Sequence, residues 1–127
     1  EEAQRRARSI VQLAEEHAAA RTAKTMNRLS LQIYEIALGL QSEDVALSPL
    51  LEEYLDHPVP DVRCWLAALM LSENSERAIR ILEDLEVAQE VRGFSPIVAK
   101  YTLVEWRAGR LPPLSKIVEN ARRSLSQ

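Results

Sequence analysis

The sequence predicts an all-α domain, and three observations support that prediction. Apolar residues recur at intervals of three and four, the spacing of one helix face, and not at the alternating spacing of a strand. All three glycines and all six prolines lie beyond Leu38, so nothing in the opening part of the chain breaks a helix. The 127 residues, 46% hydrophobic and 28% charged, suit one globular domain.

Residues 1–42 are expected to form a first pair of helices. One helix from Glu1 to Leu38 would far exceed the mean helix length of about 11–12 residues, so we place a turn near Arg21 and Thr22. The second helix is predicted to end near Gly39 and to bury one stripe: Met26, Leu29, Ile33, Ile36, Ala37 and Leu40.

Residues 43–71 are expected to form the second pair. Its first helix is predicted to start after Ser42, whose hydroxyl can cap the free amides, and to run towards Leu55. Pro49 either kinks this helix or restarts it after Ser48, because proline is accepted in a first turn and not in a helix interior.

A proline turn at residues 56–60 should lead into the fourth helix, which opens at Pro60 and continues through Leu71. From Val62 onward this helix is apolar or small on every side except for Arg63, which places it at the centre of the domain. An unpaired buried guanidinium is very costly. Arg63 is therefore expected either to contact a ligand or to form an ion pair with one of three carboxylates: Asp56, Asp61 or Glu105.

Residues 74–109 are expected to form the third pair, and residues 113–124 a terminal helix. Asn74 is the predicted cap of the fifth helix, while Ser95 and Pro96 start the sixth, which ends at Gly109. The residues predicted to point inward are Ala78, Ile79, Leu82 and Leu85 in the fifth helix and Ile117, Val118 and Ala121 in the last.

Paired helices that stack side by side are the unit of an α-solenoid. The segment 56–63, followed by Leu66, Ala67 and Met70, resembles the turn and second helix of a HEAT repeat. The stretch from Ile10 to Leu111 also resembles an uncharacterised bacterial family of small HEAT-like helical domains. The likeness lies in Asn27–Leu29, His57–Arg63, Ser75–Ala78, Gly93–Ser95, Leu103–Trp106 and Gly109. The resemblance implies a short HEAT-like α-solenoid of about three helix pairs plus a C-terminal helix. It transfers no enzymatic activity, because none is established for the family.

Signatures of catalysis and metal binding are missing from the sequence. The glycines are too far apart for a phosphate-binding loop. His17, His57 and Cys64 are the only soft-metal ligands, whereas a zinc site normally takes three or four at recognisable spacing. We therefore predict no enzyme activity, no cofactor and no metal, with Cys64 a packed core thiol and His57 a turn residue.

Three of the six aromatic residues, Trp65, Tyr101 and Trp106, are expected to pack in the core. Tyr101 falls in one stripe with Ile97 and Val104, which predicts that this stripe faces inward. An aromatic-lined ligand groove is the alternative interpretation.

Charge is unevenly distributed, although the net charge is only -3. No Lys or Arg lies between Arg28 and Arg63, whereas basic residues gather near both ends of the chain. This acidic segment either is simply a solvated face or steers a charged partner. Its acids are Glu35, Glu43, Asp44, Glu52, Glu53, Asp56 and Asp61.

These observations predict a non-enzymatic module that binds a protein or peptide on the face lined by its second, fourth and sixth helices. A basic partner would suit the acidic segment. A HEAT-like protein that binds or modifies nucleic acid is the alternative, ranked lower because the central pair is acidic where such a protein needs a basic stripe. The candidate binding residues are Arg63, Glu52, Glu53, Asp56, Asp61, Lys100 and Glu105.

The sequence also bears on where the protein acts. A single cysteine, Cys64, cannot form an internal disulfide, which favours a reducing compartment, and we expect the cytoplasm. No apolar run approaches the roughly 20 residues that a membrane-spanning helix needs, so no membrane contact is expected.

Overall fold

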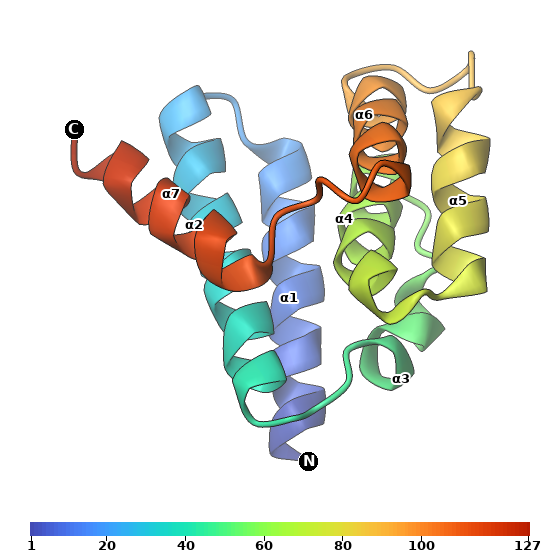
Figure 1. Ribbon diagram of the computed structural model, residues 1–127. Helices are drawn as coiled ribbons and strands as arrows, with labels where there is room; N and C mark the ends of the chain where they lie inside the picture. Colours follow the sequence, from blue (N-terminus) through green and yellow to red (C-terminus); the bar gives the residue numbers. More distant parts are fainter.

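The computed structural model describes all 127 residues and contains α-helices and short 3₁₀ turns but no strand (Figure 1), which confirms the all-α class. The helices are α1 (Glu2–Ala19), α2 (Ala23–Ser42), α3 (Ser48–Leu51), α4 (Pro60–Met70), α5 (Glu76–Glu86), α6 (Ser95–Arg107) and α7 (Leu114–Leu125), and the 3₁₀ turns are η1 (Glu52–Tyr54) and η2 (Leu71–Glu73).

Helix α4 is the centre of the arrangement. It packs against α1 on one side and against α5 and α6 on the other, while α7 crosses back to pack on α2 (Figure 1). This central position confirms the sequence prediction, but the enclosure is incomplete. Asp61, Trp65 and Ala68 form one face of α4 that is only half-buried, because α2 and α6 flank that face without covering it.

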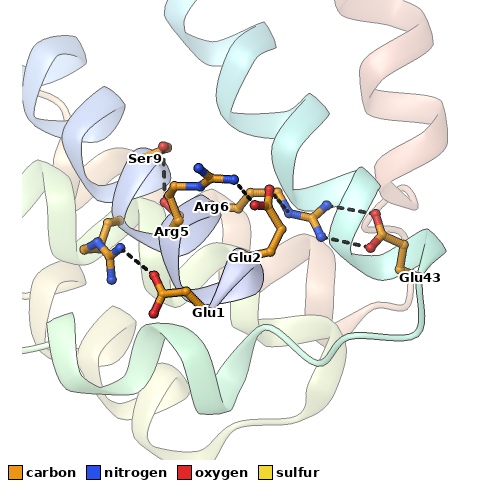
Figure 2. A network of polar contacts seen from close by, with 7 residues as sticks. Glu1, Glu2, Arg5, Arg6, Ser9 and Glu43 are labelled. Carbon is orange, nitrogen blue, oxygen red and sulfur yellow. Dashed lines mark hydrogen bonds and ion pairs between the residues drawn. The ribbon is translucent and has the colours of Figure 1, made fainter.

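The first helix pair turns where the sequence predicts. Thr22 caps α2, its Oγ1 accepting a hydrogen bond from the Thr25 amide at 3.2 Å. At the opposite end of the pair, Arg6 of α1 donates two hydrogen bonds to the carboxylate of Glu43, at 2.8 and 2.9 Å (Figure 2). A bidentate pair of this kind fixes orientation as well as distance, so the two helices are joined at both ends.

The start of the third helix differs from the prediction. Ser42 is the last residue of α2, and its hydroxyl donates to the Leu38 carbonyl at 2.8 Å instead of capping a new helix. The new helix α3 begins at Ser48, so Pro49 restarts the helix instead of kinking it. The Glu73 carboxylate accepts hydrogen bonds from the amides of residues 47 and 48, both at 2.7 Å. The cap therefore comes from a distant part of the chain.

The later boundaries follow local signals more closely. Ser75, not Asn74, caps α5, its Oγ accepting from the Ala78 amide at 3.2 Å, while Asn74 adopts a left-handed conformation with φ of 55° that ends η2. Gly109, with φ of 72°, ends α6 as predicted, since glycine adopts this conformation without a steric penalty.

The middle pair is uneven, because α3 is a single short turn opposite the 11-residue α4. Helix α1 packs directly on α2, and α5 packs directly on α6. The HEAT-like arrangement of these pairs stays a prediction.

Leu66 and Ala67, both 0% exposed, supply a test of the central position of α4. Leu66→Ala should lower the free energy of unfolding by about 2–5 kcal/mol because it leaves a cavity. Ala67→Leu should lower it by about 1–3 kcal/mol because the site has no room for added methylenes. Denaturant unfolding measures both, with the exposed positions Leu125→Ala and Ala46→Leu as matched controls. Unchanged midpoints in both core variants would show that α4 is peripheral.

Candidate functional site

A groove follows the half-buried face of α4, with α2 as one wall and α6 as the other. Its main hollow has a volume of about 420 Å³. The lining residues are His17 from α1, Met26, Ser30 and Tyr34 from α2, Asp61, Cys64, Trp65 and Ala68 from α4, and Phe94, Ser95, Val98 and Thr102 at the start of α6 and along it.

A second hollow of about 210 Å³ continues the groove towards α7. The two hollows share Tyr34, Trp65, Ala68 and Thr102, so they form one depression. The loop that leads from α6 to α7 borders the second hollow with Leu111, Pro112 and Pro113, and α7 borders it with Leu114 and Ile117.

The groove exists because α6 places its small residues on the packed side. Ser95, Ala99 and Leu103 are the buried residues of α6, spaced four apart along one face. Small side chains at the first two positions let α6 approach its neighbours closely. The larger side chains of Phe94 and Val98 then remain outside, 72% and 47% exposed, along the groove wall.

Trp65 is the aromatic centre of the groove floor. The ring of His17 meets it edge-on, with ring centroids 5.3 Å apart and planes at 80°. Tyr34 approaches at 5.1 Å and 61°. Such edge-to-face contacts are favourable beyond the area that they bury, so Trp65 is held between helices α1 and α2.

His17 is an uncharged member of this cluster. Burial is the main effect on its pKa and lowers it, while the nearby Asp61 charge opposes the shift. Its Nδ1 atom is buried without a hydrogen-bond partner. Near neutral pH the ring is therefore neutral, because its ordinary pKa is already about 6.5.

Asp61 and Cys64 stand at one end of the main hollow, beside the start of α6. The Ser95 hydroxyl donates a hydrogen bond to Oδ1 of Asp61. The thiol of Cys64 lies 4.0 Å from the Ser95 carbonyl oxygen, and burial raises its pKa to about 12. Because the thiolate is the nucleophile, a thiol with so high a pKa is inert. The prediction of a packed core thiol is confirmed.

The predicted binding residues are dispersed over the surface, and only Asp61 lines the groove. Glu53 and Lys100 are exposed. Glu52 and Asp56 approach Arg77, at 3.9 and 2.8 Å, and Glu105 pairs with Arg110 at 3.0 Å.

The ion pair predicted for Arg63 is wrong. Its Nη1 donates instead to the carbonyl oxygens of His57 at 2.8 Å and Pro58 at 3.2 Å. The guanidinium thus ties the proline turn to the start of α4. His57 is a turn residue as predicted; the Val59 amide donates to its Nδ1 at 3.0 Å, and its Nε2 lies 2.7 Å from a carboxylate oxygen of Glu15.

The inward stripe predicted on α6 is also wrong. Ile97, Tyr101 and Val104 are 54%, 62% and 43% exposed, because the small residues described above occupy the packed face. Trp106 packs against the core as predicted. Trp65 also packs against the core as predicted, and it lines the groove as well, which agrees with the alternative interpretation of an aromatic-lined groove.

The acidic segment is partly neutralised by arginines from other helices. Glu35 pairs with Arg122 of α7 at 2.7 Å. Glu43 and Asp56 pair with Arg6 and Arg77, as described above. The segment therefore carries less net charge at the surface than its sequence indicates.

Sequence reasoning missed His17, Tyr34 and Phe94 as parts of the site. Tyr34 lies in step with Met26 and Ser30, four residues apart on α2. Met26 was predicted to lie in the buried stripe of α2, but it is only half-buried and lines the groove, so its spacing with Ser30 and Tyr34 marks a second face of this helix. No comparable signal marked the other two residues.

No protein-family model matches the chain, and no curated protein or solved structure is significantly similar to it. No group of three or more His, Cys, Asp or Glu side chains is arranged to hold a metal ion. None of the helices combines the length and apolar character needed to cross a membrane.

The neutral state of His17 predicts a pH dependence of stability. Because its pKa is lowered in the folded state, the unfolded chain takes up the proton first as pH falls through about 6.5. The stabilisation is present above that pH and is lost below it. Between about pH 7.5 and 5.5 the wild type should therefore lose more unfolding free energy than His17→Gln, as measured by denaturant unfolding. Equal losses would contradict a buried neutral His17.

Proposed function

We propose that this protein is a non-enzymatic module that binds a segment of another protein in the groove between α2, α4 and α6. The observation that supports this proposal is the groove itself, two connected hollows of about 420 and 210 Å³ with an aromatic floor. The larger hollow lies within the range of about 300–1,000 Å³ that is typical of ligand sites.

The shape and walls of the groove favour a peptide segment over a compact small molecule. The two hollows follow one another along α4, so a ligand that fills both must be elongated. Phe94 and Val98 on the wall, and Tyr101 beyond it, are large apolar side chains that water covers in the free protein. Exposed apolar patches of this kind typically mark interaction surfaces.

The proposal of a non-enzymatic role rests on the chemistry of the lining. Asp61 is the only carboxylate among the lining residues, and the one thiol is buried and protonated. General acid–base or nucleophilic catalysis normally pairs a nucleophile with an adjacent base. The groove holds one hydroxyl beside a carboxylate, Ser95 and Asp61, and Ser95 is only 3% exposed, so a substrate in the groove has little access to that hydroxyl.

Nucleic-acid binding is the less favoured alternative, because most of the C-terminal basic residues already have carboxylate partners. Arg107, Arg110 and Arg122 pair with acids at 2.8, 3.0 and 2.7 Å, and Lys116 and Arg123 share Glu119. Neutralising phosphates supplies most of non-specific nucleic-acid affinity, and each of these basic residues would have to exchange its carboxylate partner for a phosphate.

Nucleic-acid binding can be tested directly by measuring the affinity of the protein for duplex DNA and RNA. Duplex DNA or RNA should bind the wild type no more tightly than micromolar at physiological salt, as measured by fluorescence anisotropy. Submicromolar binding that weakens steeply with added salt would reverse the ranking of the two functions.

The groove can be tested by filling it. Peptides selected from a random displayed library against the wild type should lose at least about tenfold in affinity for Ala68→Trp, because residue 68 lines both hollows. Ala46→Trp, at an exposed loop position outside the groove, is the matched control and should bind them normally. Circular dichroism checks that both variants are folded. Equal binding by Ala68→Trp, or a library that yields no binder, would contradict the proposal.

A further inference from the structure

We propose that the main hollow of the groove receives a lysine or arginine side chain of the bound segment, with its charge at Asp61 and its stem along Trp65. This inference rests on the proposed function and names the chemistry of the partner. Three features of the lining support it: its charge, the state of Asp61 and the aromatic floor.

The charge of the groove has one sign and one source. Among the residues that line the two hollows, Asp61 is the only one with a formal charge at neutral pH, and no lysine or arginine is present. His17, the one other titratable base, is neutral because burial lowers its pKa. A cationic group entering the main hollow therefore meets one carboxylate and no competing cation.

Asp61 is also free to accept a ligand. Asp56 and Glu43, in the same acidic segment, are paired with Arg77 and Arg6, whereas no lysine, arginine or histidine pairs with Asp61. The Ser95 hydroxyl bonds Oδ1 and holds the carboxylate in place, while Oδ2 accepts no hydrogen bond from the protein. A positioned carboxylate with one open oxygen is suited to a charge-assisted hydrogen bond.

The floor and walls fit the rest of a basic side chain. Trp65, Tyr34 and Phe94 line the same hollow as Asp61. Aromatic faces attract cations, most strongly in the case of tryptophan. Lysine and arginine also carry apolar stems that pack on such surfaces while the head group reaches a polar contact. A purely apolar ligand would bury the carboxylate unpaired, at a cost in free energy.

The second hollow lacks any charged lining residue, and Leu111, Leu114 and Ile117 are among the apolar side chains that line it. It suits an apolar side chain of the same segment. The preferred sequence thus has a basic residue close to an apolar one.

The selected peptides test this inference through their sequences. A library selected on the wild type should be enriched in lysine or arginine at one position. Selection on Asp61→Asn should lose that enrichment and keep the apolar one. Wild-type-selected basic peptides should bind Asp61→Asn about tenfold more weakly by calorimetry. Asp84→Asn, which removes an exposed carboxylate on α5, is the matched control and should bind normally. Enrichment without a basic position, or an undiminished affinity for Asp61→Asn, would overturn the inference and leave the groove intact.

A second measurement tests the basic pocket without any peptide. N-acetyl-lysine methylamide, titrated at millimolar concentrations, should shift the indole NH resonance of Trp65 more than N-acetyl-norleucine methylamide does, and the difference should vanish in Asp61→Asn. Equal shifts from the two compounds would overturn the inference. A lysine-specific shift combined with a library that yields no binder would instead reject the proposed peptide function and support the cation pocket.

Discussion

The structure depends on one packing constraint: α4 has to pack against α1, α5 and α6 at the same time. Small buried residues make this possible, among them Ala67 on α4, Ala78 on α5 and Ala99 on α6, each 0% exposed. They bring the helix axes close together, while Leu66 and Met70 fill the space between them. Three neighbours cover most of α4, and the face that carries Trp65 and Ala68 is left for the groove.

The same constraint accounts for the exposed apolar side chains of α6. Ser95, Ala99 and Leu103 form the packed face of this helix, so the large apolar side chains on its other faces stay at the surface. Phe94 and Val98 become a groove wall, and Tyr101 extends the apolar surface beyond it. The proposed binding function thus uses surface that the packing of α6 produces, and the loop through Pro112 and Pro113 borders its far end.

Local signals made much of this fold predictable from the sequence. The turn at Thr22, the start of α4 at Pro60 and the end of α6 at Gly109 each depend on neighbouring residues alone. Features that depend on contacts between residues far apart in the sequence could not be predicted in this way. The amides at the start of α3 are capped by Glu73. Helix α6 carries apolar residues on two faces, so the spacing of its apolar residues does not show which face is buried. The candidate site was misplaced for the same reason. Acidic residues that are prominent in the sequence have arginine partners elsewhere in the chain, whereas the groove is assembled from residues of helices that are distant in sequence.

The most direct measurement of the central claim is a crystal structure of the protein with a library-selected peptide bound. We expect peptide density along α4, in contact with Trp65 and Ala68 and between α2 and α6. Density on the outer acidic surface around Glu52 and Glu53, with the groove empty, would contradict it.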